Sequence, residues 1–298
     1  MACDLYSLSA AAWMKRKGSA QVLIYDAREL YTELPSVARR PVLKFVWRTL
    51  ERRGLMRTNL IIVTAPNDAD AICRVHSFLP RPVLVRNLPW RETELMPDRT
   101  LLDRFRIPKD AKTIVYLGGL QPGRGLEQLI EAMNPAPYEG EGQVRGHLLL
   151  IGDGAMRPKL AALAQMLNVA PVVHFAGPLP SNEALRCVKA CDAGVSLVEP
   201  VSRSYELALP SKLFEYMMCG LPVVSSRMEQ VLDLFRDEEW ITFVDERDVQ
   251  SIRDGMQKAL ANSGNPMLRE REQSLALREY HFEHDAASLA AALKTFLG

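Results

Sequence analysis

Two apolar patterns alternate along the chain. Short continuous apolar runs are typical of parallel strands buried on both faces; they predict strands over 21–26, 60–64, 82–85, 113–117, 147–151, 172–175, 193–197 and 222–225. Segments with helical spacing lie between them and predict helices over 7–17, 37–53, 68–78, 126–133, 156–167, 182–190, 212–218 and 280–298. This alternation predicts doubly wound α/β domains, which bind ligands at the carboxyl ends of their strands.

One stretch, residues 87–112, interrupts the alternation. It holds Pro89, Pro97 and Pro108, many charges and no long apolar run, as linkers do. We therefore predict a first domain over 1–105 and a second over 106–280, with the helix over 280–298 packing back on the first. A length of 298 residues suits two domains. Only three clear strands fall in the first domain, so it is predicted to be incomplete.

Charge divides the chain into unlike halves. Residues 1–110 hold 19 Lys and Arg against 12 Asp and Glu, whereas the remainder holds 18 against 24, for a net charge of +1 overall. A basic first half points to an anionic surface or ligand. No apolar run approaches the roughly 20 residues that span a bilayer, and no secretory signal precedes the first helix. The five cysteines form no disulfide or metal-binding pattern. We expect a cytoplasmic protein that needs no metal and binds no nucleic acid.

The first candidate site is a glycine-rich turn after the strand over 113–117. Gly118 and Gly119 allow close approach of a ligand to the backbone. The next helix start offers free amides and a positive dipole end, and Arg124 can hold two phosphate oxygens. The pattern indicates a phosphate site; a purely structural turn is the alternative.

The second candidate site is the start of the helix over 212–218. Pro210 and Ser211 mark that start. Lys212 lies in the first turn, where a cation opposes the helix dipole unless an anion is bound beside it. Glu215 shares its face, and its carboxylate suits the two hydroxyls of a ribose. The alternative is a local Lys212–Glu215 ion pair on the surface.

Together these motifs resemble the donor domain of a known enzyme family. With Gly152-Asp153-Gly154, Phe175-Ala176-Gly177 and the run over 220–224, residues 112–235 resemble retaining GT-B glycosyltransferases of family four. Weaker similarity covers residues 4–8, 25–30 and 86–89. The resemblance implies two Rossmann-like domains and transfer of a sugar, with retention, from a UDP or GDP carrier to a hydroxyl acceptor. The expected pathway is glycan, polysaccharide or glycolipid biosynthesis, and a lipid-linked molecule is one candidate for the acceptor.

The resemblance also implies residue roles. Arg124 and Lys212 would hold the diphosphate and stabilise the leaving group, and Glu215 would hold the ribose. Glu206 is the candidate for the family's first acid, although that acid would fall at Leu207. The remaining donor contacts would come from Gly118, Gly119, Gly177, Pro178, Leu179, Ser211 and Leu213.

Other features depart from the family pattern. Gly119 stands where many members have arginine, and Arg28 replaces a histidine near the transferred sugar. These departures and the incomplete first domain leave an alternative, a non-catalytic nucleotide-sugar-binding subunit or truncated pseudoenzyme completed by a partner chain. An epimerase of the same fold is a weaker alternative, because its acid/base set is not visible.

The helix over 37–53 is strongly basic. Residues 39–57 contain a single acid, Glu51, and seven cations, Arg39, Arg40, Lys44, Arg48, Arg52, Arg53 and Arg57. Leu43, Val46, Trp47 and Leu50 form one apolar stripe. The charge predicts peripheral contact with an anionic membrane; an ordinary surface helix with its stripe in the core is the alternative. His147 and His174 are expected to be core residues rather than catalysts.

Overall fold

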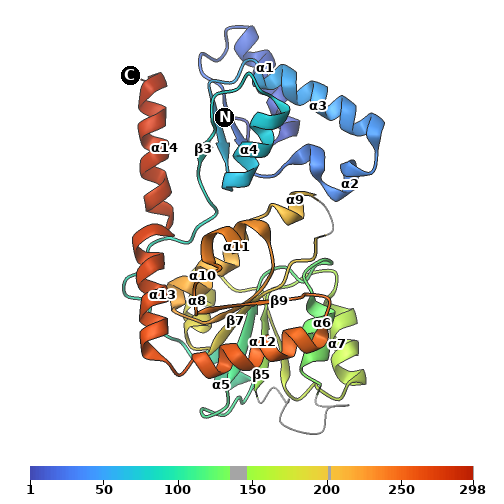
Figure 1. Ribbon diagram of the computed structural model, residues 1–298, viewed down its shortest axis with the longest axis vertical. Helices are drawn as coiled ribbons and strands as arrows, with labels where there is room; N and C mark the ends of the chain where they lie inside the picture. The colour runs from blue at the N-terminus through green and yellow to red at the C-terminus, as the bar shows by residue number, and fades with distance from the viewer. Residues whose placement is uncertain (135–145, 201–202, 298) are drawn as a thin grey trace. The chain divides into compact units, whose positions relative to one another are not determined.

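The computed structural model describes residues 1–134, 146–200 and 203–297, and the chain divides into two compact units (Figure 1). The first unit comprises Met1–Leu88, Pro200–Leu209 and Phe282–Gly298. The second unit comprises Pro89–Glu199 and Pro210–His281. The chain therefore enters the first unit three times. The proline-containing stretch over 89–112, which the sequence places largely in the first domain or the linker, belongs to the second unit.

A parallel three-stranded sheet forms the centre of the first unit. The strand order is β1-β2-β3, and Ala2 adds one isolated parallel bridge to Tyr25. Leu8, Tyr25 and Leu55 are buried in its core. The elements are α1 (Leu5–Arg16), β1 (Ile24–Ala27), the 3-10 helix η1 (Tyr31–Glu33), α2 (Pro35–Ala38), α3 (Pro41–Leu55), β2 (Leu60–Val63), α4 (Pro66–Val75), β3 (Val83–Leu84), α9 (Arg203–Glu206) and α14 (Phe282–Leu297).

The C-terminal helix α14 packs against β3 within this unit. Arg86, just after β3, donates to Asp285 of α14 from its backbone amide, from Nε and from Nη2, at 2.8, 2.9 and 2.6 Å. Both side chains are nearly buried. Burial by itself acts to raise the pKa of Asp285, but the hydrogen bonds and charge of Arg86 outweigh it and lower the pKa. A charged pair of this kind stabilises the helix only while both partners remain charged.

Helix α3 does not bury its predicted apolar stripe as one face. Trp47 packs against the core, whereas Val46 and Leu50 are exposed. Val42 and Phe45, outside the predicted stripe, are the most exposed apolar side chains of the helix, at 77% and 72%. The predicted stripe is therefore divided between core and surface, because the buried face of α3 is shared with polar groups.

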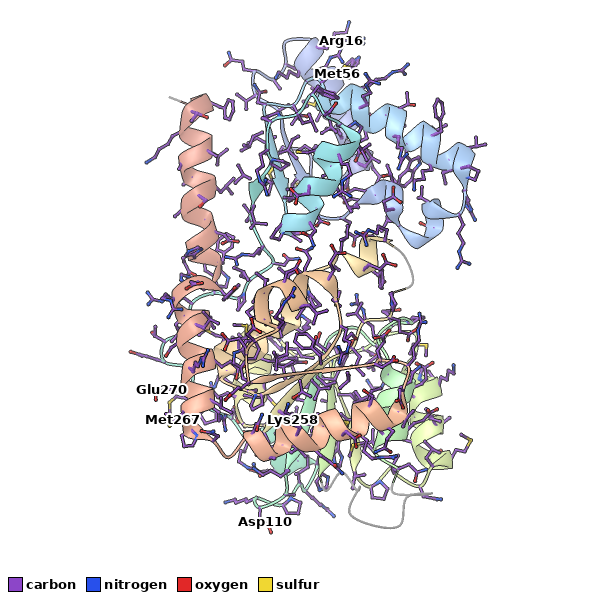
Figure 2. The ribbon with its side chains drawn as sticks, viewed as in Figure 1. Arg16, Met56, Asp110, Lys258, Met267 and Glu270 are labelled. Carbon is purple, nitrogen blue, oxygen red and sulfur yellow. The ribbon has the colours of Figure 1, made fainter. Side chains whose placement is uncertain are left out.

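Polar pairs occupy that buried face. Glu33 of η1 accepts from Lys44 at 2.5 Å and from Arg48 at 3.0 Å. Glu51 pairs with His76 at 3.1 Å, and both are buried. Two of the seven cations counted in the sequence are thus held inside their own unit. Arg16 and Met56, labelled in Figure 2, lie on the exposed surface nearby.

The second unit is a six-stranded parallel sheet with the order β6-β5-β4-β7-β8-β9. Its strands are β4 (Thr113–Leu117), β5 (His147–Ile151), β6 (Val173–Gly177), β7 (Ala193–Ser196), β8 (Val223–Ser226) and β9 (Ile241–Val244). Its helices are α5 (Thr100–Arg104), α6 (Leu126–Ala132), α7 (Arg157–Met166), α8 (Ser181–Lys189), α10 (Ser211–Cys219), α11 (Glu229–Phe235), α12 (Val249–Asn262) and α13 (Pro266–Glu279). The doubly wound parallel topology predicted from the sequence is confirmed. Strand β9 and the helices α5 and α11 to α13 had no counterpart in the prediction.

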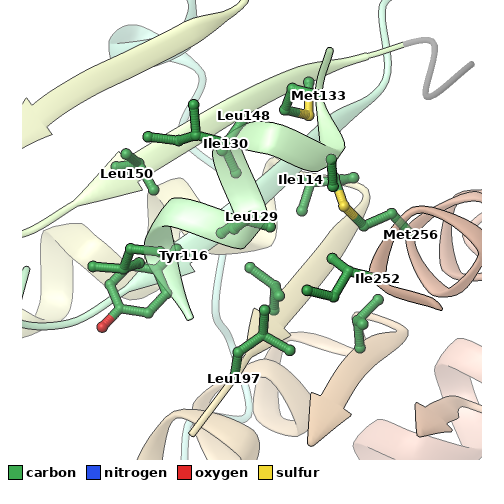
Figure 3. Close-up of a cluster of buried hydrophobic side chains, with 14 of the residues drawn as sticks. Ile114, Tyr116, Leu129, Ile130, Met133, Leu148, Leu150, Leu197, Ile252 and Met256 are labelled. Atoms are coloured by element: carbon green, nitrogen blue, oxygen red, sulfur yellow. The ribbon is translucent and has the colours of Figure 1, made fainter. Parts of the chain in front are cut away.

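Helices cover both faces of this sheet. On one face α6, α7 and α12 enclose a core in which Ile114, Leu148, Leu129, Ile252 and Met256 meet (Figure 3). Helices α8 and α10 pack on the strands from the other side, and α13 packs on α10. From β4 the order runs outward through β5 and β6, then returns to β7 and runs out the other way. This reversal between β4 and β7 is where open α/β sheets bind ligands.

Candidate functional site

Three strand ends of the second unit are joined by backbone contacts that leave no room for side chains. A Cβ on Gly152 would lie 1.9 Å from the carbonyl oxygen of Gly118, and one on Gly154 would lie 2.3 Å from that of Leu120. The Gly152 amide donates to the Gly177 carbonyl at 2.9 Å. Gly118, Gly152 and Gly177 all have positive φ, which glycine adopts without strain. The glycines that the sequence singles out thus meet at one edge of the sheet.

The glycine-rich turn (residues 118–125) is anchored by a buried tyrosine. The Tyr116 hydroxyl donates to the Gly119 carbonyl at 2.9 Å. Burial raises the pKa of Tyr116, and the positive charge of Arg124 acts in the opposite direction. Arg124 belongs to this turn and is half-buried. The turn therefore carries one cation of its own.

Glu199, which the sequence reasoning missed, closes the far end of this turn. Its carboxylate accepts from the Gly125 amide at 3.3 Å, and its own amide donates to the Gly123 carbonyl at 3.0 Å. The amide at the start of α6 is therefore not available to a phosphate. The expectation of free amides at this helix start is wrong at Gly125, because an acid from the end of β7 already accepts from it. Glu199 lies 74 residues from Gly125 in the sequence, so only the fold, and no local sequence motif, identifies it.

The first helical turn of α10 lies beside the glycine-rich turn. A Cβ on Gly118 would lie 3.5 Å from Lys212 Cε, so the lysine side chain passes over the glycine. Its Nζ lies 3.3 Å from Glu215 Oε2. Burial raises the pKa of Glu215, while the charge of Lys212 lowers it. The ion pair left as the alternative reading is thus present, but it is partly buried beside the turn rather than on open surface.

The other donor positions from α10 differ in what they can offer. Ser211 is half-buried at the first helical residue. Leu213 is fully buried, and its amide donates to the Pro210 carbonyl at 3.2 Å. Leu213 therefore serves mainly to seat the helix in the core.

Strand β6 ends at Gly177, and the loop that follows begins with exposed Pro178 and half-buried Leu179. Arg157 of α7 reaches under it. Its Nη1 lies 3.6 Å from Asp153 Oδ2, and its Nη2 donates to the Phe175 carbonyl at 3.5 Å. Arg157 is a second residue that the sequence reasoning missed, since nothing in its local pattern distinguishes it from a surface arginine.

Residues 98–278, more than half of the chain, match the family model described as glycosyl transferases group 1. The chain belongs to this family. The membership predicted from the motifs is confirmed, and the matched residues lie almost wholly in the second unit.

Curated members of the family show moderate identity. The D-inositol 3-phosphate glycosyltransferase of Thermomonospora curvata is 28% identical over 152 residues, covering 49% of this chain and 34% of that protein. The lipopolysaccharide core biosynthesis glycosyltransferase LpsE of Rhizobium meliloti is 30% identical over 227 residues, covering 76% of this chain and 61% of that protein. The chain thus matches about a third of the length of the first relative and less than two thirds of the second.

Solved structures extend the likeness to both units. The crystal structure of HepE from Anabaena in complex with UDP has a TM-score of 0.75 and 15% identity, covering 98% of this chain and 77% of that chain. At this identity the likeness shows the fold, and it confirms the predicted GT-B class with two Rossmann-like domains.

Three positions that the sequence analysis singled out lie in the first unit. Glu206 of α9 pairs with Arg203 at 3.0 Å. Leu207, where the family's first acid would fall, is 3% exposed and belongs to the core of the first unit. Arg28 is exposed and pairs with Asp26 at 3.0 Å. The role of Glu206 stays a prediction.

Proposed function

We propose that the chain is a glycosyltransferase whose second unit binds a nucleoside diphosphate sugar at the ends of β4 and β6 and the start of α10. The single observation that carries the proposal is the placement of Lys212 over Gly118, beside a turn that also holds Arg124. Two cations at the switch point of a parallel sheet suit a diphosphate. Bonds from charged donors would also stabilise the departing diphosphate, which is where charge develops during transfer.

Glu215 is proposed to accept from the two ribose hydroxyls. Its carboxylate lies 3.3 Å from Lys212 Nζ, and a carboxylate has acceptor positions beyond those that one cation uses. The Gly177, Pro178 and Leu179 loop is proposed to contact the base through its backbone. A UDP or GDP carrier is supported by the UDP complex of HepE, and transfer of a hexose with retention by the resemblance of the motifs. Family membership favours an enzyme over a non-catalytic binding subunit.

Calorimetric titration with UDP, GDP and their sugars tests the donor site. Lys212→Ala should weaken diphosphate binding about tenfold, because a charge-assisted bond contributes roughly 1.5 to 3 kcal/mol. Lys258→Ala is the matched control, since Lys258 is exposed on α12 of the same unit (Figure 2). Equal affinity of Lys212→Ala and the wild type would move the site elsewhere. Hydrolysis of the bound sugar donor, with the released anomer read by NMR before it equilibrates, tests retention.

We also propose that α1 and α3 of the first unit rest on an anionic membrane, which would bring a lipid-linked acceptor to the enzyme. An open hollow of about 540 Å³ lies between these helices, lined by Trp13, Leu50 and Met56 and by three arginines, Arg16, Arg53 and Arg57. Exposed apolar side chains bordered by cations suit the interface of an anionic bilayer. In the described part of the chain, no helix is both long and apolar enough to cross a membrane.

Co-sedimentation with vesicles tests the membrane proposal. Binding to anionic vesicles should fall with salt, and binding to neutral vesicles should be weak. The double variant Arg53→Glu, Arg57→Glu should bind far less than the wild type. Arg48 is left intact because it pairs with Glu33. Vesicle binding that neither salt nor this double variant changes would contradict the proposal.

A partner chain that completes the first unit is proposed as well. The outer edge of β1 pairs, within the described residues, through the single bridge of Ala2 to Tyr25. Open strand edges accept further strands. Light scattering should therefore detect association through this unit, and a monomer that binds no dye specific for apolar surface would contradict the idea.

A further inference from the structure

The strands β4 and β7 separate before they end. They pair at Ile114 with Ala193 and at Val115 with Gly194, and the pairing then stops, although β4 continues to Leu117 and β7 to Ser196. In a parallel ladder of this register, the next hydrogen bond would run from the Leu117 amide to the Val195 carbonyl. This separation is at the switch point of the second unit.

One hydroxyl group occupies the place of that hydrogen bond. The Leu117 amide donates to the Tyr216 hydroxyl at 2.9 Å, and the hydroxyl donates to the Val195 carbonyl at 3.1 Å. Tyr216 therefore satisfies both backbone groups while keeping the two strand ends apart. Unsatisfied buried amides and carbonyls are costly, so the hydroxyl is the element that makes the separation stable.

The neighbouring glycine makes room for the ring. A Cβ on Gly194 would lie 2.4 Å from Tyr216 Cγ, so the ring packs directly on the glycine backbone. Tyr216 is fully buried on α10, where it follows Glu215 and lies one turn after Lys212. The same side chain thus joins the end of β4, which leads into Gly118, to the helix that carries the ion pair.

We propose that Tyr216 is a positioning residue for the donor diphosphate: its hydroxyl sets the opening between β4 and β7 and so fixes Lys212 against the glycine-rich turn. This inference rests on the proposed donor site. Without the hydroxyl, the ladder would close by a direct Leu117–Val195 bond, or both groups would lose their partner. Either outcome changes the spacing between the turn and Lys212, while the Gly177 loop at the end of β6 keeps its own contacts.

Tyr216→Phe removes the hydroxyl and keeps the ring. UDP and GDP binding is measured by calorimetry, and uridine and guanosine binding by ligand-observed NMR, on the full chain. The variant should bind the preferred diphosphate roughly fivefold more weakly, the effect expected for about one net hydrogen bond. Its loss of nucleoside affinity should be smaller, because a nucleoside has no phosphate for Lys212 to bind. Tyr25→Phe is the matched control, because Tyr25 is a fully buried tyrosine of the first unit whose hydroxyl has no hydrogen-bond partner in the described structure.

The outcomes separate the two proposals. Equal diphosphate affinity in Tyr216→Phe and the wild type, or equal losses for diphosphate and nucleoside, would overturn the positioning role and leave the donor site standing. A wild-type protein that binds no nucleoside diphosphate would overturn both. If Tyr216→Phe does not fold, amide hydrogen exchange of the wild type decides: Leu117 should be protected as strongly as Val115, and rapid exchange at Leu117 would overturn the proposal.

Discussion

The two units share a parallel α/β design, but different kinds of contact stabilise the interior of each. In the second unit, strand ends meet through glycines such as Gly152, with backbone against backbone. In the first unit, a smaller sheet depends on side-chain ties such as Arg86 with Asp285. Backbone contacts leave no room for a side chain, but their strength does not depend on the protonation of any side chain. Side-chain ties tolerate changes of backbone but fail when one partner is lost or neutralised.

The largest difference between the units should follow from adding one methyl group to a glycine in each. Gly152→Ala would place Cβ 1.9 Å from a backbone oxygen at a φ of +138°, and it should cost at least about 4 kcal/mol of unfolding free energy. Gly18→Ala, with φ at +81° and nothing within 4 Å, should cost only about 1 kcal/mol. Denaturant unfolding measures both. Similar losses would show that φ, and not close packing, governs the second unit.

The first unit should be most sensitive to loss of its buried ion pair. Arg86→Ala removes the guanidinium and leaves the buried Asp285 carboxylate with only the residue-86 amide and His284 as partners among the described residues, and should cost about 3 kcal/mol. Arg81→Ala, which removes an exposed pair with Asp70 at 3.4 Å in the same unit, should cost less than about 1 kcal/mol. Chemical denaturation followed by hydrogen exchange at β3 separates the two effects. Equal costs would remove the distinction between buried and exposed ties.

A fall in pH should affect the units in different ranges. Burial, and then the charge of His147, lower the pKa of His174 in the second unit to about 4. Its neutral form therefore contributes stability above its ordinary pKa of 6.5, which is lost as pH falls from 6.5 toward 4. The pKa of Asp285 is lowered below 3.8, so its contribution persists to that pH and is lost only below it. His174→Gln should therefore lose less stability than the wild type between pH 6.5 and 4; unfolding curves that shift equally would contradict this assignment.

The smallest expected effect concerns the carboxylate of the second unit. Glu215→Ala should weaken binding of UDP or GDP several-fold, by the net value of about one or two hydrogen bonds. It should hardly affect the 2′,3′-dideoxy analogues, which lack the hydroxyls. Titration calorimetry with the two kinds of nucleotide measures the difference. Equal losses for both would assign Glu215 to support of Lys212 instead.

The sequence predicts a site residue when that residue lies in a short motif, and does not when the contact joins segments far apart in the chain. Gly118, Lys212 and Glu215 lie in short motifs at element boundaries, so their meeting at one sheet edge followed from the parallel topology. Glu199 and Arg157 reach the site from other strand and helix ends, and no motif in the neighbouring sequence predicts their contacts.

The same limit applies to the fold. Most strands of both sheets are continuous apolar runs and were predictable, but Ile241–Val244 is short and contains Thr242. The outward-facing Val42 and Phe45 of α3 could not be foreseen either. The polar groups Glu33, Glu51 and His76 that take the inner face come from three separate elements.

The return of α14 to the first unit has a consequence for how the chain is made. Domains commonly fold in order of synthesis, the N-terminal one first. Here the ribosome synthesises residues 89–281, which contain the whole second unit and the segment 200–209 of the first, before it reaches Asp285. Asp285, the partner of Arg86, is therefore made nearly two hundred residues after it. The unit that is begun first is therefore completed last. During synthesis β3 stays uncovered while the second unit can already fold, so a nascent chain stalled before residue 282 should present a mature second unit beside an unfinished first one.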